Sequence, residues 1–157
     1  MSSNSHILTG WMLLASALGG CGSDPAGLSL LSGQVSGEYK GMTADLTFGL
    51  AATGSAQSLL GFSSKTIDCG SLESNSPPRG TFGIVYLSSL EVGSYGSLLV
   101  QMAYNEGNYA AEGTNAGTVT ITTSSETTIA GSVAYANTNS DGETFSLAGT
   151  FEVERCP

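Results

Sequence analysis

The chain has 157 residues, the length of one compact domain, and its composition argues against several classes of protein. Hydrophobic residues make up 40% and charged residues only 11%, which is too apolar and too weakly charged for a disordered chain. Thirteen acidic residues against four basic ones give a formal net charge of −9. This balance argues against nucleic-acid binding, because contacts to phosphates need Lys and Arg.

The first predicted element is an apolar run at residues 7–20, ILTGWMLLASALGG. It is shorter than the roughly 20 residues of a membrane-spanning helix, and it is typical of the hydrophobic part of a cleaved signal peptide. The run ends at Leu18-Gly19-Gly20-Cys21, where the chain resembles bacterial lipoproteins. Their lipobox has an aliphatic residue at −3, small residues at −2 and −1, and a Cys at +1. The resemblance implies cleavage before Cys21 and acylation of its sulfur and new amine with chains such as palmitate.

This N-terminus predicts three units: a signal peptide over 1–20, a lipidated N-terminus and tether over 21–32, and one β-domain over 33–157. Two alternatives remain, an ordinary secretory signal with an incidental Cys21 and a buried apolar N-terminal segment. Gly22 follows Cys21 where the best-known sorting rule of this class has an Asp for retention at the inner membrane. The resemblance therefore implies a cell-envelope location, anchored to the outer membrane.

Cleavage before Cys21 would remove His6 and Trp11, the only His and the only Trp of the chain. A mature chain without His lacks the side chain that most hydrolase triads and zinc sites use. Cys69 and Cys156 would then be an even pair in an oxidising compartment, so we predict a disulfide between them; two free buried thiols are the alternative. Cys156 has the opposite parity from Phe151 and Val153, so we expect a bulge or the strand end to redirect it.

Alternation of apolar and polar residues predicts a series of strands from Gly33 onward. No stretch after Cys21 sustains an amphipathic helical period. In each expected strand the apolar residues lie on one side and face the core. The expected strands cover 33–41, 46–50, 57–63, 65–69, 82–86, 98–104, 118–122, 129–135 and 144–154. Turns are expected at 105–108 and at Asp141-Gly142. Together they predict an all-β fold, an antiparallel β-sandwich or an up-and-down β-barrel of about eight strands.

The last third of the domain carries a second resemblance. Residues 117–156, GTVTITTSSETTIAGSVAYANTNSDGETFSLAGTFEVERC, resemble the C-terminal hairpins of small uncharacterised bacterial lipoproteins, through strand alternation and a terminal Cys. The resemblance implies an envelope β-domain and no particular activity.

Candidate sites for chemistry are few. Asn137, Asn139 and Asp141 match the opening of an EF-hand calcium loop, but Ala148 stands where the closing Glu belongs, and a hairpin turn explains all of these residues. No nucleophile or dinucleotide motif occurs, and no cofactor is expected. A carboxylate-based hydrolase would need two acids that meet in a cleft. The acids available for such a pair are Glu38, Asp45, Asp68, Glu73, Glu91, Glu112, Glu152 and Glu154.

We therefore expect a structural or macromolecule-binding module, not an enzyme, whose partners are the membrane, through Cys21, and an envelope protein or glycan. Expected contact sites are the loops 70–80, 105–117 and 137–143, with Tyr95 and Tyr109 near turns. One alternative is a calycin-like barrel that holds a small apolar ligand, and a carboxylate hydrolase is a further one. The pocket of such a barrel would be lined by Tyr39, Phe48, Phe82 and Phe145.

Overall fold

The computed structural model describes residues 30–73, 80–104, 108–113 and 117–157. These residues are almost entirely strand, which confirms the predicted all-β fold. One short helix, α1, covers Cys69–Glu73. The strands are β1 Leu30–Tyr39, β2 Met42–Thr53, β3 Ser58–Ser63, β4 Phe82–Leu87, β5 Gly93–Gly96, β6 Leu99–Tyr104, β7 Asn108–Gly113, β8 Thr118–Ser124, β9 Thr128–Thr138 and β10 Thr144–Arg155.

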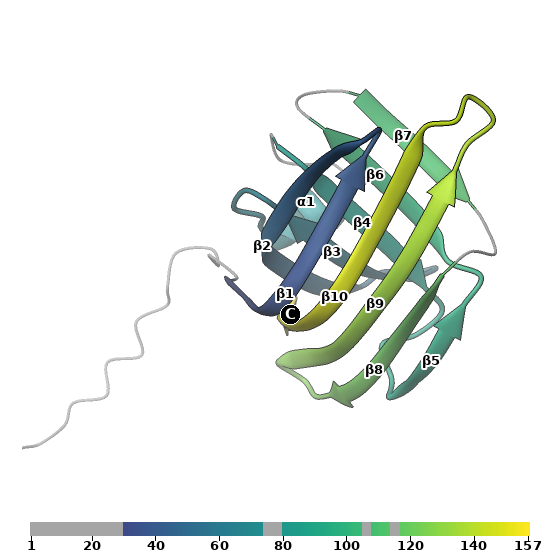
Figure 1. The fold of residues 1–157 in the computed structure, drawn as a ribbon. Coiled ribbons are helices and arrows are strands. Elements are labelled where there is room, and N and C mark those ends of the chain that lie inside the picture. Colours follow the sequence, from purple (N-terminus) through teal and green to yellow (C-terminus); the bar gives the residue numbers. More distant parts are fainter. Residues whose placement is uncertain (1–29, 74–79, 105–107, 114–116) are drawn as a thin grey trace, which may run out of the picture.

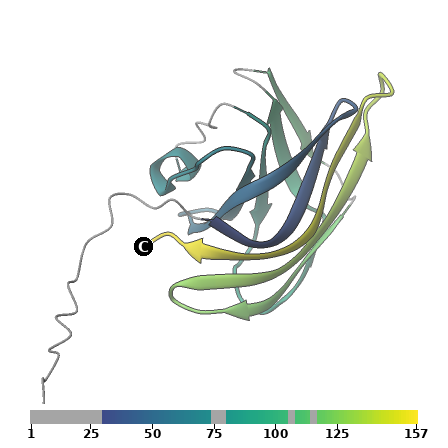
Figure 2. The same cartoon turned by 60° about the vertical axis from the view of Figure 1, so that its left-hand side comes forward.

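The strands form one ten-stranded sheet in the order β5-β8-β9-β10-β1-β2-β3-β4-β6-β7. Neighbours in this order are antiparallel, and the sheet curls into a half-barrel (Figure 1, Figure 2). The first and last strands of the domain are neighbours, β1 beside β10. Beyond the start of β1, β10 pairs directly with β2 in parallel at Glu154–Leu50 and Arg155–Ala51. The described part has more strands than the eight or so expected, because β5 and β7 lack clear alternation and were not predicted.

The concave side of the sheet holds the inner core. The alternation in the C-terminal third predicts its members correctly, since Phe145, Leu147, Phe151 and Val153 of β10 are all buried there. Phe62 and Phe151 meet edge to face with ring centroids 5.4 Å apart, and β9 contributes Ile129 among others. Burying each such side chain stabilises the fold by about 1.5–3 kcal/mol relative to exposure. The half-barrel is therefore a packed core and not an open cup.

A second layer of buried side chains, the outer cluster, lies on the convex side of β2, β3 and β4. Its members are Leu50, Ala52, Ile67, Leu72, Ile84, Ala103 and Cys156, with Phe48, Leu59, Cys69 and Tyr86 packed against them. The prediction that Leu46, Phe48 and Leu50 share one face is wrong, because Leu46 points into the inner core and Leu50 into the outer cluster. Val35 pairs with Leu46 and Leu30 with Phe48, and the pairing is irregular between these two pairs. At this irregularity the even-numbered residues of β2 change from the inner side of the sheet to the outer side.

In β4 the prediction chose the wrong side of the sheet. We expected Phe82, Ile84 and Tyr86 to face the main core, but Val85 and Leu87 do so, and Ile84 lies in the outer cluster. Both sides of β4 are apolar, since Ile84 and Val85 are each 0% exposed. Alternation in the sequence cannot tell the two sides of such a strand apart.

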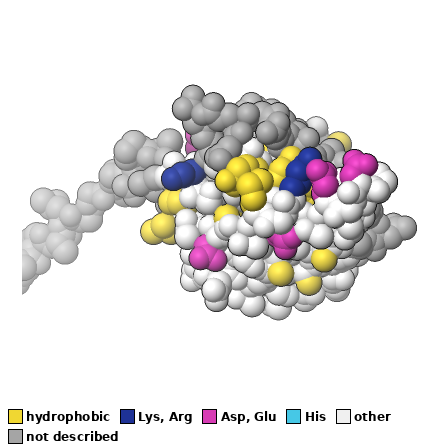
Figure 3. All heavy atoms as spheres, turned by 45° about the horizontal axis from the view of Figure 1, so that its top comes forward, with side chains coloured by type: hydrophobic (Ala, Val, Ile, Leu, Met, Phe, Trp, Pro, Cys, Tyr) yellow, Lys and Arg dark blue, Asp and Glu magenta, His cyan; other side chains and the backbone are white. Residues whose placement is uncertain are grey.

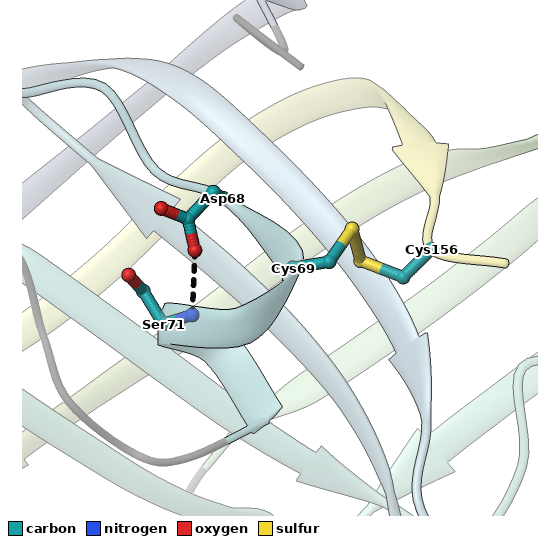
Figure 4. Close-up of a disulfide and its surroundings, with 4 residues drawn as sticks. All are labelled: Asp68, Cys69, Ser71 and Cys156. Carbon is teal, nitrogen blue, oxygen red and sulfur yellow. Dashed lines mark hydrogen bonds between the residues drawn. A yellow bond between two sulfur atoms is a disulfide. The ribbon is translucent and has the colours of Figure 1, made fainter. Parts of the chain in front are cut away.

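Residues 65–69 do not form the predicted strand; they lead into α1, which covers the outer cluster. Asp68 starts the helix, since its Oδ1 accepts the backbone N–H of Ser71 at 2.7 Å (Figure 4). This hydrogen bond holds the pKa of the Asp68 carboxyl below its usual value. A side chain that accepts a backbone N–H at a helix start is favourable, which explains why even five residues form a turn of helix here.

The predicted disulfide is present. Cys69, the first residue of α1, is bonded to Cys156 just after β10, with the Cα atoms 5.7 Å apart (Figure 4). We expected a bulge or the strand end to redirect Cys156, but it lies in the outer cluster, on the side opposite Phe151 and Val153 that its parity predicts. The bond ties the C-terminal end of the chain to the helix that covers β2–β4.

Tight turns join the strands at one end of the half-barrel. Tyr39 pairs with Met42, so the β1–β2 turn has only Lys40 and Gly41 in it, with φ of 52° and 80°. Two positive φ values are typical of the type I′ turn, which matches the twist of a hairpin. The predicted β9–β10 hairpin is confirmed at Asp141-Gly142, where Gly142 N–H donates to the carbonyl of Asn139 at 3.1 Å.

Candidate functional site

An open hollow lies at the end of the half-barrel where β1 begins, opposite the two tight turns. It lies between the β2–β3 hairpin, the end of β4 and the short strand β5, and its volume is about 530 Å³. Its lining is made of Ala56, Gln57, Tyr86, Leu87, Ser88, Ser94, Tyr95, Gly96, Ser97, Leu98 and Leu99. Backbone, hydroxyl groups and tyrosine rings therefore form most of its wall.

A second hollow of about 290 Å³ adjoins the first and shares Ala56, Gln57 and Ser88 with it. Thr53, Glu91 and Arg155 belong to its lining, together with the residues of the β2–β3 turn. We call the two adjoining hollows together the end groove. Their shared residues place them next to each other, so a ligand that is longer than one hollow can contact both.

The end groove exists because β5 does not pair with β4 or β6, the strands that come before and after it in the sequence. β4 pairs with β6, whereas β5 pairs with β8 at the other edge of the sheet. The chain must therefore cross the end of the half-barrel twice, through 88–92 and through Ser97 and Leu98. Ser97 has a φ of 53°, a left-handed conformation that few residues other than Gly adopt, at the reversal from β5 into β6. This crossing leaves the space between β4, β5 and the β2–β3 hairpin unfilled.

Two tyrosines of the end groove are fixed by hydrogen bonds. The Tyr86 hydroxyl donates to Gln101 Oε1 at 2.8 Å, and the Tyr95 hydroxyl donates to the Glu91 carbonyl at 2.7 Å. Partial burial also raises the pKa of Tyr86, so it is a neutral phenol at physiological pH. Both rings are half-buried, and a ligand meets them already oriented. Tyr95 is thus one predicted contact residue that the structure places in a concave surface.

The end groove carries little net charge. Glu91 and Arg155 are the charged residues among its lining side chains. The Arg155 guanidinium is engaged, since it donates to the Ser125 carbonyl at 3.1 Å and to Thr53 Oγ1 at 3.0 Å. The rest of the lining is neutral, so the surface is suited to uncharged hydrogen-bonding groups.

The other sequence candidates lie elsewhere. In the loop that matches the opening of an EF-hand, Asn139 Oδ1 accepts the backbone N–H groups of Asp141 and Glu143 at 3.0 and 2.9 Å, so this side chain closes the hairpin. Asn137, in β9, lines a separate shallow hollow of about 330 Å³. Across the described ranges, no three His, Cys, Asp or Glu side chains are grouped so as to hold a metal ion.

Several candidate carboxylates make structural contacts of their own, and Asp45 is exposed on β2. Glu38 accepts a hydrogen bond from the Thr144 hydroxyl, Asp68 caps α1, and Glu91 borders the end groove. Glu152 and Glu154 are exposed on β10, and the side chains of Glu73 and Glu112 are outside the described part. Glu143 forms an ion pair with Lys40 at 2.9 Å, and this contact lowers the pKa of Glu143 and raises that of Lys40.

The four aromatic residues expected around an apolar ligand do not line one pocket. Tyr39 and Phe145 fill the inner core and touch edge to face at 5.4 Å. Phe48 lies on the other side of the sheet, against the outer cluster. The side chain of Phe82 lies outside the described residues. The expected lining is therefore split between the two faces of the sheet.

The opposite end of the half-barrel presents a different surface. It carries the β1–β2 turn and the β9–β10 hairpin, and apolar side chains come to the surface there beside basic and acidic ones (Figure 3). Met42 is 39% exposed, and the Tyr39 and Tyr104 rings stack below with centroids 6.3 Å apart. Residues 105–107, which follow Tyr104 in the chain, are outside the described part.

No described residue of the three predicted contact loops is among the lining residues of the end groove. The range 70–80 contains part of α1, and its residues 74–79 are outside the described part. The range 105–117 is not simply a loop, because β7 occupies Asn108–Gly113; Tyr109 is in this strand, and its side chain is not described. The hairpin 137–143 lies at the opposite end. The missed segments are the turn at 54–57 and the crossing at 88–98, for which Gly54-Ser55 and Ser88-Ser89 were available signals.

Comparison with known proteins adds no relative to this picture. A scan against protein-family models, a search of curated proteins and a search of solved structures each returned no match. In the part of the chain that the structure describes, no helix has the length and apolarity needed to cross a membrane.

Proposed function

We propose that the protein is a lipid-anchored module of the cell envelope that binds a macromolecule through the end groove and does not catalyse a reaction. The observation that carries this proposal is the composition and setting of the groove. Tyr86, Tyr95, Gly96 and several serines line an open hollow of about 530 Å³ at the end of a packed sheet. Tyr, Ser and Gly are also the residues that dominate antibody binding loops, where rigid rings supply contact area and small polar groups supply hydrogen bonds.

The sequence supports the anchor, and the disulfide supports export. Disulfides persist in oxidising compartments, so the Cys69–Cys156 bond agrees with removal of a signal peptide before Cys21. β1 begins at Leu30, so eight residues separate it from Cys21, and the two Cα atoms can be at most about 30 Å apart. The end groove is at the same end of the half-barrel as Leu30. A partner in the groove would accordingly lie near the membrane that holds the anchor.

Two alternatives receive less support. A general acid needs a carboxyl group with a raised pKa, whereas the pKa values of Asp68 and Glu143 are lowered by their hydrogen bonds. A barrel that holds an apolar ligand needs an empty interior, whereas the inner core is filled by large side chains such as Phe62 and Phe145. A binding surface on a filled scaffold accounts for both observations.

The anchor is tested by replacing Cys21 with Ser. The wild-type chain should incorporate a labelled fatty acid and partition into detergent, and the Cys21→Ser variant should do neither. An unchanged label and unchanged partitioning in the variant would show that the lipid assignment is wrong.

Binding through the end groove is tested by crosslinking in the native envelope. A photoreactive amino acid replaces Ser88, which borders both hollows, and in a matched control it replaces the exposed Thr150 in the middle of β10. We expect a discrete crosslinked species from position 88 and none from position 150. Equal products from the two positions, or none from position 88, would contradict the proposal.

A further inference from the structure

We infer that the ligand of the end groove is an uncharged glycan chain. This inference rests on the proposed function and narrows it from a macromolecule to one chemical class. The juxtaposition that carries it is two tyrosines with hydrogen-bonded hydroxyls beside Gln57, Ser88 and Ser94, in a nearly neutral hollow that adjoins a second one.

The chemistry of the lining matches that of a sugar. A pyranose ring has an apolar C–H face and a rim of hydroxyl groups that both donate and accept hydrogen bonds. Tyr86 and Tyr95 are half-buried residues of the lining, Tyr86 packed against the outer cluster and Tyr95 against the inner core. A tyrosine ring is a suitable contact for the first of these features. Gln57 offers an amide donor and acceptor, and the serine hydroxyls offer both functions as well.

The rings are also prepared for binding. Because the hydroxyls of Tyr86 and Tyr95 donate to Gln101 and to the Glu91 carbonyl, neither ring has to lose much freedom when a ligand arrives. The oxygen of each hydroxyl keeps a lone pair that can accept a hydrogen bond from a sugar hydroxyl. Binding of a sugar would therefore lose little free energy to the ordering of these side chains.

Charge argues for an uncharged ligand over an ionic one. The chain carries a formal net charge of −9, which repels anionic chains in general. Arg155, which could bind a carboxylate or phosphate, already donates to Ser125 and Thr53. Glu91 is the acid that borders the groove, and one exposed carboxylate does not make a site for a polycation. Neutral hydroxyl groups are the chemistry that remains.

The adjoining second hollow argues for a chain of sugars over a single sugar. The first hollow, at about 530 Å³, is within the roughly 300–1,000 Å³ range of small-molecule sites. The second, at about 290 Å³, extends it past Ala56, Gln57 and Ser88 towards Arg155. An oligosaccharide can occupy both hollows at once, with Gln57 near the junction.

The test is binding of the oxidised mature domain, residues 22–157, to a panel of immobilised neutral and acidic oligosaccharides, followed by titration of the best soluble ligand. We expect neutral members to bind and acidic members of similar length not to bind. Tyr95→Ala and Gln57→Ala should each weaken binding at least about tenfold. Tyr95→Phe, which keeps the ring but loses the hydroxyl that orients it, should weaken binding less than Tyr95→Ala does, and Glu152→Gln on the convex face should leave the affinity unchanged.

Circular dichroism and the melting temperature confirm that each variant is folded before affinities are compared. The inference is overturned if no neutral oligosaccharide binds, if acidic ones bind better, or if Tyr95→Ala and Gln57→Ala bind as the wild type does. If the panel is negative but position 88 still crosslinks to a protein, the glycan is wrong and the macromolecule-binding function stands. If both experiments are negative, both proposals fail.

Discussion

The two halves of the sheet are built differently. In β8, β9, β10 and β1 one face is buried and the other meets solvent, and β10 shows this in the alternation of buried Phe145 and Leu147 with exposed Thr144 and Ala148. In β3 and β4 both faces are buried, so that Leu60 and Gly61, neighbours in the chain, are both inaccessible. Alternation therefore identifies the core face in the first half and loses this meaning in the second.

The two halves differ because a short segment, residues 67–73, packs over the convex side of one of them; we call this segment the cover. α1 and the segment before it place Ile67 and Leu72 over the convex side of β2–β4, and the disulfide fastens this cover to the end of β10. The covered half also supplies a wall of the end groove, because Tyr86 both packs against the outer cluster and lines the groove. We therefore expect changes under α1 to affect the groove, and changes on the bare convex face of β10 to leave it alone.

The largest expected effect comes from removing the disulfide. The Cys69→Ser, Cys156→Ser double variant should lose about 4 kcal/mol of unfolding free energy, because the sequence separation of 87 residues makes the loop that the bond closes in the unfolded chain a long one. Urea unfolding of the mature domain measures this loss. Wild-type protein unfolded in the presence of a reductant should lose a similar free energy of unfolding. A loss below about 1 kcal/mol would show that the disulfide to α1 contributes little to the stability of the fold.

Truncation of a side chain in the outer cluster should cost nearly as much as truncation in the inner core. Ile84 and Leu147 are each 0% exposed, on opposite faces of the sheet. Replacing either with Ala should cost about 2–5 kcal/mol, because each change leaves a cavity. The exposed Glu152 is the matched control, and Glu152→Gln should stay within about 0.5 kcal/mol of wild type. An Ile84→Ala variant as stable as this control would mean that the convex side of β4 is not a core.

Two glycines on the paired strands β3 and β4 face opposite sides of the sheet, so that replacing each with Ala tests the packing on one side. Gly61 faces the outer cluster and Gly83 faces the inner core. A Cβ at Gly61 would lie 2.7 Å from Cδ1 of the buried Leu72 in α1, whereas a Cβ at Gly83 would meet Leu147 at an ordinary 3.6 Å. Gly61→Ala should cost about 1–3 kcal/mol, since the cover must shift to make room. Gly83→Ala should be close to neutral or slightly stabilising. Thermal unfolding of both variants measures the contrast, which would be refuted by equal melting temperatures.

The smallest expected effect is the pH response of α1. The folded-state pKa of Asp68 is lowered below its unfolded value of about 3.9, so its contribution is fully present above that value and is lost as pH falls through the folded pKa. The backbone amide signal of Ser71 should therefore move in acid below about pH 4 in an NMR titration. In Asp68→Asn, which keeps a capping oxygen but cannot ionise, this step should disappear. Persistence of the step would assign it to another group.

The half of the sheet with one buried face was predictable, because in its strands apolar residues face the core and polar residues face solvent. Phe145, Leu147, Phe151 and Val153 identify a core face, and Asp141-Gly142 identifies the turn before them. The Cys69–Cys156 pair also followed, because these two cysteines remain once Cys21 is assigned to the predicted lipid anchor. The faces of β2 and β4 did not follow, because a cover supplied by distant residues determines them.

The candidate site was less predictable than the fold. The end groove brings the turn at 54–57 together with residues 86–99, and only the pairing of β5 with β8 creates the space between them. Tyr95 was singled out for its place near a turn. Gly54-Ser55 and Ser88-Ser89 indicate turns in the sequence, but they do not indicate that Gln57 and Ser88 belong to one site. A groove formed by a chain crossing depends on sheet order, which alternation does not specify.

The most direct test of this two-half account is amide hydrogen exchange of the mature domain in its oxidised and reduced forms, at labelling times short compared with global unfolding. We predict that reduction increases exchange in 58–73 and in β4, under and beside the cover, and leaves β9 and the first residues of β10 unchanged. Equal increases in both halves, or an increase confined to β9 and β10, would contradict the claim that the disulfide-fastened cover holds β3, β4 and the wall of the groove.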